Sequence, residues 1–252
     1  MYKISDGTEF VGKGIILLPK CHSTNDIAAE LWNKGIISPG SVVITDHQTK
    51  GRGQRGNTWE SDPGVNLTFS LVLIPDFLNI QQNFYLNIVT SLAITDALMK
   101  LDNSFSIKWP NDIIYRQKKI GGILIENSLQ SERIIFSVIG IGINVNQAQF
   151  TLVDGAISLY QIFKHTFNLN DLLNQLLKSM DQRWKALYER QFNKLKTAYI
   201  ERLYGLHRMK DFQIKETIRK GRITGIDVVG RLEVLIDGKL QKFNFQEIKC
   251  LN

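Results

Sequence analysis

The stretch GRGQRGNTW, residues 51–59, decides between two folds for this chain. It follows an apolar run, SVVIT at 41–45, and its glycines fit the letter of a dinucleotide-binding loop, G-x-G-x-x-G. Such a loop must open a helix, because the helix N-terminus holds the pyrophosphate. Here the chain continues as NTWESDPGVNL, with a Pro-Gly turn and then a second β-rich run. The match is therefore accidental, and a dinucleotide fold is not expected.

The loop at 51–59 is nevertheless both flexible and cationic. Its three glycines allow positive φ angles and a close approach of the backbone to a ligand. Arg52 and Arg55 offer planar donors that suit carboxylate or phosphate, and Trp59 adds a flat apolar face. Taken alone, the loop fits a ligand-binding lid, a solvated surface loop or an RNA-contacting segment equally well.

Bulk composition narrows the class of protein only a little. The chain has 252 residues, 43% of them apolar and 22% charged, which suits a globule with a substantial core. The formal net charge of +7 favours anionic partners such as nucleic acid, phosphates or an acidic protein. Because the charge is spread along the chain, it selects none of these.

The two cysteines, Cys21 and Cys250, form neither a disulfide framework nor a metal-binding spacing. The first residues, MYKISDGTEFVGKG, contain no apolar segment typical of a secretion signal. No apolar run approaches the roughly 18 residues of a membrane span. We therefore expect a cytoplasmic protein with unpaired thiols and no membrane association.

The pattern of apolar residues predicts helices over 23–34, 82–101 and 170–204, the last broken near 192–194. Strand-like runs fall at 41–46, 65–74, 105–109, 112–115, 120–127 and 134–145. From about Lys210 the chain changes to short apolar runs separated by glycines, at 212–218, 222–229, 231–236 and 239–245. We expect an α+β domain over 1–208 and a small β-barrel domain over 209–252.

Four further motifs each have an ordinary interpretation when taken alone. They are Ser-Thr-Asn at 23–25, a helix cap; KWPND at 108–112, a turn; KKIGGILIE at 118–126, a strand with paired glycines; and GIGINVN at 140–146, an apolar strand. Together with QTKGRGQRGNTW at 48–59, and in this order, they resemble the biotin protein ligases, also called biotin–[acetyl-CoA-carboxylase] ligases. The resemblance covers about 15–205 and implies a mixed-sheet catalytic domain of the biotin/lipoate ligase type, class II synthetase-like, followed by a small SH3-like β-barrel.

The resemblance implies a reaction in two steps. Biotin and ATP first give biotinyl-5′-AMP and pyrophosphate, and a lysine of a biotin carboxyl carrier protein domain then takes the biotin and releases AMP. Two anions must meet in the first step, so cations must lie between them. The mixed anhydride must also be kept from water. Mg²⁺ is expected with ATP, bound through phosphates and water rather than by a dedicated cluster of side chains.

The resemblance also implies the site residues. Catalysis falls to Lys119, Arg52 and Asp112. Biotin is bound by Ser23, Thr24, Asn25, Gln48, Gly51, Arg52, Lys119, Gly122 and Ile123. ATP is bound by Arg52, Arg55, Trp59, Lys108, Asn111 and Asn144. In this scheme Lys119 offsets repulsion between biotin carboxylate and α-phosphate, the loop at 51–59 closes over the adenylate, Trp59 covers adenine, and Asp112 accepts or orients the proton of the carrier lysine.

Two departures from the family pattern bear on function. Many bacterial members carry an N-terminal winged-helix DNA-binding domain, whereas only residues 1–22 precede the Ser-Thr-Asn motif, so no DNA binding is expected. The loop commonly reads G-R-G-R-R-G, but Gln54 replaces one arginine. We expect weaker retention of the adenylate as a result.

Other functions remain open at this stage. A lipoate–protein ligase would share the fold and the adenylate chemistry. An RNA-binding protein would use the basic surface, and a biotin-binding module would lack catalysis. The sequence also leaves open whether the chain is a monomer or a homodimer.

Overall fold

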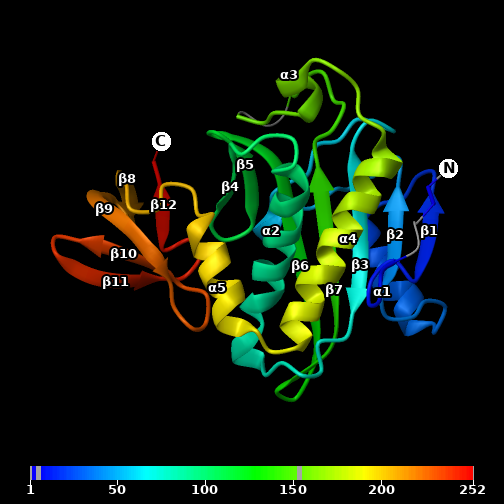
Figure 1. The fold of residues 1–252 in the computed structure, drawn as a ribbon, viewed down its shortest axis with the longest axis horizontal. Helices are drawn as coiled ribbons and strands as arrows, with labels where there is room; N and C mark the ends of the chain where they lie inside the picture. The colour runs from blue at the N-terminus through cyan, green and yellow to red at the C-terminus, as the bar shows by residue number, and fades with distance from the viewer. Residues whose placement is uncertain (1, 4–6, 152–154, 252) are drawn as a thin grey trace.

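A computed structural model describes residues 2–3, 7–151 and 155–251 of the chain, and within them the side chain of Arg55 is not described. The described residues form two β-sheets, a large one with helices packed on it and a smaller one near the C-terminus (Figure 1). The α+β class predicted from the sequence is confirmed. No helix in these ranges is both long and apolar enough to pass through a membrane.

The larger sheet has seven strands in the order β1-β2-β3-β7-β6-β5-β4. Its strands are β1 Gly14–Leu18, β2 Ser41–Thr45, β3 Leu67–Leu73, β4 Phe105–Lys108, β5 Asp112–Tyr115, β6 Lys118–Gln130 and β7 Arg133–Ile143. The first two are parallel and all other neighbours are antiparallel, so the sheet is mixed as expected. Strand β1 was not predicted, although its sequence GIILL is an apolar run.

The helices lie on both faces of this sheet (Figure 1). They are α1 Thr24–Asn33, α2 Phe84–Leu98, α3 Leu159–Phe163, α4 Leu169–Tyr188 and α5 Phe192–Glu201. The break between α4 and α5 falls at 189–191 rather than at 192–194. Arg190 adopts a left-handed φ of 58° there, which ends α4 without the glycine or proline that would mark the break in the sequence.

Alternation along the strands assigns the two faces different roles. On β3, Leu67, Phe69 and Leu71 point into the main core, which includes α2 and α4. Val72, from the opposite face, packs with Ala28 of α1 in a second cluster. Helix α1 covers only part of this second face, because it contacts β2, β3 and β7. The remainder of that face is free to hold a site.

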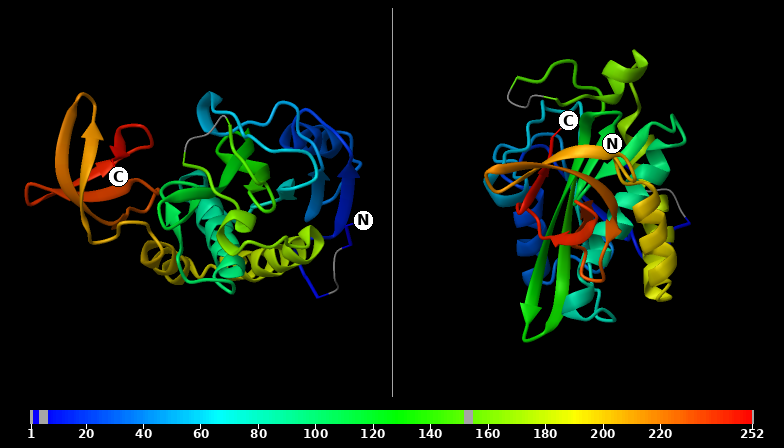
Figure 2. Two further views of the ribbon diagram at one scale, coloured as in Figure 1. Left: turned by 90° about the horizontal axis from the view of Figure 1, so that it is seen from above. Right: turned by 90° about the vertical axis from the view of Figure 1, so that its left-hand side faces the viewer.

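The smaller sheet is antiparallel, with strand order β11-β10-β9-β8-β12. Its strands are β8 Met209–Ile214, β9 Thr217–Ile226, β10 Leu232–Ile236, β11 Lys239–Phe243 and β12 Ile248–Cys250. It lies at one end of the molecule, beyond α5, while β1 lies at the other (Figures 1 and 2). Among the described strands no pairing joins β11 to β12, so closure into a barrel stays a prediction, as does the domain boundary at 208/209.

The two sheets are joined by contacts around the KWPND segment. The indole N–H of Trp109 donates to the carbonyl of Gly230, 2.9 Å away, in the β9–β10 loop. Phe84 of α2 lies so close to Gly230 that a Cβ on Gly230 would be 2.1 Å from the Phe84 ring. The loop itself is held by Asp227, whose carboxylate accepts hydrogen bonds from Arg231 and two backbone N–H groups. The smaller sheet is therefore fixed against the edge of the larger one.

Helices α2, α4 and α5 are tied together by one carboxylate. Asp96 accepts hydrogen bonds from Arg183 at 2.6 and 3.0 Å and pairs with Arg202 at 2.7 Å. Burial of Asp96 acts to raise its pKa, but the two guanidinium groups outweigh burial and the pKa is lowered. The charged form of Asp96 therefore stabilises the helical layer.

Candidate active site

Glycines form the floor of a cavity on the face of the larger sheet that α1 leaves open. The strand register places Thr68, Gly142, Gly122, Asp112 and Lys108 in one row across β3, β7, β6, β5 and β4. Because residues directly opposite each other on neighbouring strands point to the same face, all five belong to the same side of the sheet. The row has polar side chains at its two ends, whereas its second and third positions are glycines and have no side chain.

Trp59 and Lys119 lie over this floor. A Cβ added to Gly142 would be 2.4 Å from Cε2 of Trp59, so the indole ring occupies the space that a larger residue would need. The equivalent atom on Gly122 would be 3.4 Å from Nζ of Lys119 and 3.6 Å from the six-membered ring of Trp59. Gly142 therefore makes room for the tryptophan, whereas a Cβ on Gly122 would make only ordinary contacts with Lys119 and Trp59.

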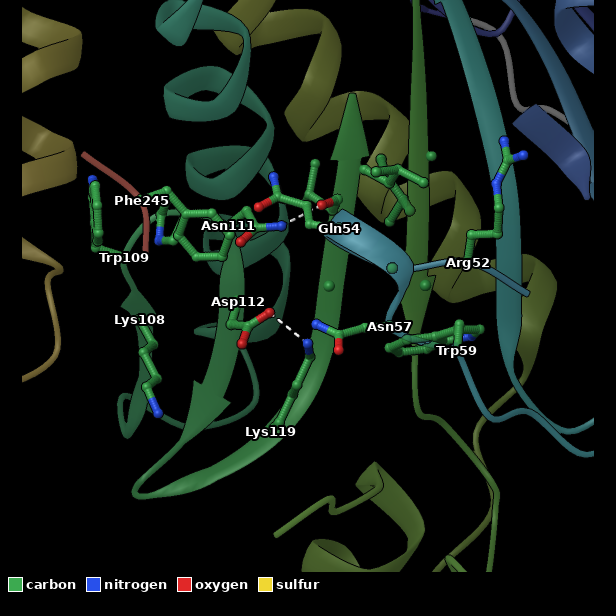
Figure 3. Close-up of a pocket in the computed structure, with 18 of the residues that line it drawn as sticks. Arg52, Gln54, Asn57, Trp59, Lys108, Trp109, Asn111, Asp112, Lys119 and Phe245 are labelled. Carbon is green, nitrogen blue, oxygen red and sulfur yellow. Dashed lines mark hydrogen bonds and ion pairs between the residues drawn. The ribbon is translucent and has the colours of Figure 1, made fainter. Parts of the chain in front are cut away.

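Lys119 and Asp112 form an ion pair beside the floor. Nζ of Lys119 is 2.5 Å from Oδ1 of Asp112, and the two side chains are 36% and 30% exposed. Figure 3 shows both pointing toward the same space, with Asn57 beside them. The backbone of Lys119 is fixed by hydrogen bonds with Gly155 and Ile157. Such a pair can place a positive charge beside an anionic ligand and a carboxylate that accepts a proton.

A polar cluster forms on the α1 side of the cavity. Ser23 caps α1, and the backbone N–H of Thr24 donates to Oε1 of Gln48 at 2.8 Å. Ser70 of β3 bridges Thr24 and Asn25, with its Oγ 2.7 Å from the hydroxyl of Thr24 and 2.6 Å from Oδ1 of Asn25. These groups provide donors and acceptors for the polar part of a ligand.

The loop at 51–59 is a compact hairpin. The backbone N–H of Trp59 donates to the carbonyl of Gly51 at 3.0 Å, and the backbone N–H of Gly53 donates to the carbonyl of Asn57 at 2.7 Å. A Cβ on Gly51 would be 2.5 Å from the carbonyl oxygen of Trp59, so glycine is required for this closure. The loop forms one wall of the cavity rather than a free surface segment.

The cavity has a volume of about 240 Å³ and brings together most of the residues predicted from the sequence. Those that line it are Ser23, Thr24, Asn25, Gln48, Arg52, Trp59, Lys108, Asn111, Asp112, Lys119, Gly122 and Ile123. They come from the start of α1, the segment 48–59, strands β4, β5 and β6, and the turn between β4 and β5. Segments far apart in the sequence thus meet at one cavity.

Two of the predicted residues lie away from the cavity wall. Gly51 and Asn144 do not line the cavity, and the side chain of Arg55 is outside the described residues. Asn144 instead donates to the carbonyl of Ile157 at 3.1 Å, which holds the segment beside Lys119. Its Oδ1 is buried without a partner among the described residues. Its direct contact with a nucleotide stays a prediction.

Arg52 lines the cavity, but its guanidinium is already paired. It contacts Asp26 of α1 at 2.6 Å and Glu126 of β6 at 3.2 Å. In Figure 3 its side chain points away from the pair formed by Lys119 and Asp112. Glu126 also accepts a hydrogen bond from Asn25 at 2.7 Å. In this structure Arg52 therefore fastens the loop to the helix and sheet.

Several residues at the site were not predicted. Thr68 and Ser70 stand in the middle of β3, where LTFSLVL reads only as a strand of alternating character. Asn57 comes from the loop, and Phe245 reaches the cavity from the smaller sheet. The available signal was the alternation of threonine and serine with leucine and phenylalanine in β3. Buried hydroxyls need hydrogen-bond partners, so this pattern indicates a polar environment on one face of the strand.

Comparison with known proteins places the chain in a family. Residues 17–144 match the Biotin/lipoate A/B protein ligase family, and the chain belongs to that family.

The relatives agree in sequence and in fold. The Bifunctional ligase/repressor BirA of Bacillus spizizenii is 30% identical over 230 residues, which is 89% of this chain and 70% of that protein. Biotin–protein ligase 2 of Arabidopsis thaliana is 30% identical over 208 residues, 79% of this chain and 61% of its own. The structure of biotin protein ligase from Aquifex aeolicus in complex with biotin and ATP superposes with a TM-score of 0.80 at 29% identity, covering 95% of this chain and 99% of that one.

Proposed function

We propose that this chain is an ATP-dependent biotin–protein ligase. It activates biotin as biotinyl-5′-AMP and transfers it to a lysine of a biotin carboxyl carrier protein domain. The observation that carries the proposal is the ion pair of Lys119 and Asp112 beside a glycine floor, in a family whose relatives include biotin–protein ligases. The relative from Aquifex aeolicus binds both biotin and ATP.

In the first step a biotin carboxylate oxygen attacks the α-phosphorus of ATP, and the bond to the β-phosphate oxygen breaks to release pyrophosphate. The ammonium of Lys119 lies between the two anions and lowers their repulsion. Lys108 supplies further positive charge around the phosphates, and Arg52 does so once its guanidinium leaves Asp26 and Glu126. Asn111, whose amide donates to the carbonyl of Ile123 at 2.5 Å, holds the adjoining backbone in place. The ring face of Trp59 opposite Gly142 covers the adenine.

In the second step the carrier lysine attacks the acyl carbon, the bond to the phosphate oxygen breaks, and AMP leaves. A free lysine with a pKa of about 10.4 is almost wholly protonated at neutral pH, so a proton acceptor is needed. Asp112 serves this role. The anionic adenylate competes with Asp112 for Lys119, and this competition frees the carboxylate when the second step requires it.

Mg²⁺ would reach the site with ATP. The described residues contain no cluster of three or more histidine, cysteine, aspartate or glutamate side chains that could hold a metal. Asp112 is committed to Lys119. The described residues do not form a magnesium cage, and Mg²⁺ would be held through the phosphates of ATP and water.

The net charge of +7 suits an acidic carrier domain, because opposite charges accelerate encounter. We expect the reaction to take place in the cytoplasm.

Lipoate transfer is the second candidate, since the family name covers both acids. The polar cluster of Ser23, Thr24, Gln48 and Ser70 favours biotin, because the apolar dithiolane ring of lipoate offers nothing to pair with these groups.

The test is incubation of the full chain with Mg-ATP, an apo carrier domain and either biotin or lipoate, followed by intact mass. The mass of the carrier should rise by one biotinyl group. A rise only with lipoate, or no rise with pyrophosphate absent in both reactions, would contradict the proposal. Binding of biotin without pyrophosphate release would identify a non-catalytic module, and salt-sensitive binding of RNA without ATP turnover would identify the nucleic-acid alternative.

A further inference from the structure

The guanidinium of Arg52 lies between two carboxylates that come from different elements. Its Nη2 is 2.6 Å from Oδ1 of Asp26 on α1, and 3.2 and 3.3 Å from the two carboxylate oxygens of Glu126 on β6. Figure 3 shows the side chain of Arg52 pointing away from Lys119 and Asp112. One positive charge thus faces two negative charges, so an anionic ligand gains no attraction from this cluster as it stands.

The two carboxylates are held in place without help from Arg52. Asp26 lies in the first turn of α1, where the helix N-terminus favours a negative charge. Oε2 of Glu126 accepts a hydrogen bond from the amide of Asn25 at 2.7 Å. That amide is fixed in turn, because its oxygen accepts from Ser70 at 2.6 Å. Asp26 and Glu126 therefore form a standing site for a guanidinium.

Arg52 is the member of this cluster that can move. Its side chain is 44% exposed, and Gly51 and Gly53 precede and follow it. Glycines give the backbone on both sides freedom to turn. Exposed ion pairs each contribute little stability, so an anion in the cavity can draw the guanidinium away. A phosphate is a suitable new partner, because the planar donors of arginine match its oxygens.

Resting on the proposed function, we infer that Asp26 and Glu126 are positioning residues that hold Arg52 away from the adenylate site in the free enzyme. Biotinyl-AMP competes with both carboxylates for the guanidinium, so its observed affinity is lowered by the fraction of molecules in which Arg52 is still paired. Return of Arg52 to the carboxylates also promotes release. The two carboxylates therefore limit how long the intermediate is retained.

The test replaces each carboxylate by the amide of the same size in the full chain. Asp26→Asn and Glu126→Gln should each lengthen the dissociation half-life of biotinyl-AMP about threefold, and the double variant about tenfold. The half-life is measured by displacing labelled intermediate with excess biotin. Glu30→Gln is the matched control, because Glu30 is an exposed carboxylate on the same helix that pairs with Lys34; its half-life should equal that of the wild type.

The sign of the effect separates this role from a structural one. If the carboxylates only fastened the loop over the intermediate, the double variant would release biotinyl-AMP faster than the wild type. A shorter or an unchanged half-life in the double variant would therefore overturn the inference.

A second comparison asks whether the carboxylates act through Arg52. In an Arg52→Gln background the guanidinium is absent, so adding Glu126→Gln should leave the half-life of that variant unchanged. Removal of a negative charge near an anionic ligand would lengthen the half-life in both backgrounds if it acted by general electrostatics. Equal lengthening with and without Arg52 would overturn the inference.

The position of Arg52 can also be measured without substrates. Trypsin binds an arginine side chain in an acidic pocket of its own, so cleavage after Arg52 requires the guanidinium to leave Asp26 and Glu126. In the free protein the double variant should be cleaved there at least about threefold faster than the wild type or Glu30→Gln. Equal cleavage rates would overturn the inference. Failure of the proposed function is a different result, because the wild type would then form no biotinyl-AMP, whichever variant trypsin cleaves faster.

Discussion

Nζ of Lys119 lies 2.5 Å from Oδ1 of Asp112, although the two residues stand on adjacent strands and belong to different sequence motifs. The pairing holds a cation and a base in one place without a ligand. It also means that the cation becomes available to an anionic substrate only when that substrate displaces Asp112. Replacing Lys119 and replacing Asp112 should therefore slow different steps of the reaction.

Replacing Lys119 should stop the first step. We expect Lys119→Ala to lower the rate of biotinyl-AMP formation at least about 10²-fold, the scale of losing one transition-state donor. The measurement is the rate of pyrophosphate release in a single turnover with biotin and ATP. Lys118→Ala is the control, since Lys118 is the exposed neighbour on the same strand. A pyrophosphate burst of wild-type size from Lys119→Ala would remove this residue from the mechanism.

Replacing Asp112 should affect the second step more than the first. Asp112→Asn keeps the size of the side chain and removes the proton acceptor. Transfer of biotin to the carrier should fall about 10²-fold, the lower end of general-base effects. Formation of the adenylate should fall much less. Both rates are measured on one preparation, so their ratio is its own control, and an equal fall in both would contradict the assigned role.

The glycine floor gives a third prediction. In Gly142→Ala the new Cβ would be 2.4 Å from the Trp59 ring, so the ring must move out of the cavity wall. We expect the Kd of biotin to rise at least about tenfold, in line with the cost of overpacking. Gly14→Ala in β1 is the matched control, because its Cβ would meet only Ser41 Oγ, at 3.8 Å. Wild-type affinity in Gly142→Ala would show that Trp59 does not shape the site.

Much of this site could be predicted from the sequence because its residues occur in short motifs with unusual composition. Paired glycines beside Lys119 and the turn before Asp112 stand out from their surroundings. Thr68 does not, because LTFSLVL is an ordinary strand until the register sets Thr68 opposite Gly142. Register depends on pairing between distant strands, and a local pattern does not specify which partner is opposite.

The direction of Arg52 was also beyond local sequence reasoning. Its partners Asp26 and Glu126 are 26 and 74 positions away. A cationic side chain in a glycine-rich loop indicates an anion nearby, but that anion can be a ligand or the protein itself. The hydrogen bond between Trp109 and Gly230 also joins residues far apart in the sequence, 121 positions from each other. Such long-range pairs decide how the smaller sheet closes one side of the cavity.

Gln54 gives a prediction about retention of the intermediate. It lines the cavity where related loops commonly carry an arginine, so one cation for the adenylate phosphate is missing. Gln54→Arg should lengthen the dissociation half-life of biotinyl-AMP about tenfold, as expected for one charge-assisted hydrogen bond. Gln130→Arg, at the exposed β6–β7 turn, adds the same charge away from the site. Equal half-lives in the wild type and in Gln54→Arg would show that the residue at position 54 does not control retention of biotinyl-AMP.

Asp96 connects stability to pH. Its pKa is lowered in the folded chain because Arg183 and Arg202 outweigh the effect of burial. Its stabilisation is therefore present above the unfolded-state pKa of about 3.9 and is lost as the pH falls through the lower folded-state value. Asp96→Asn should reduce the free energy of unfolding in urea by about 2–3 kcal/mol at pH 7, and this difference from the wild type should shrink at about pH 3 and below. Asp76→Asn, at an exposed position, should stay close to the wild type throughout. A difference for Asp96→Asn that is the same at both pH values would show that the charge of Asp96 does not stabilise the helical layer.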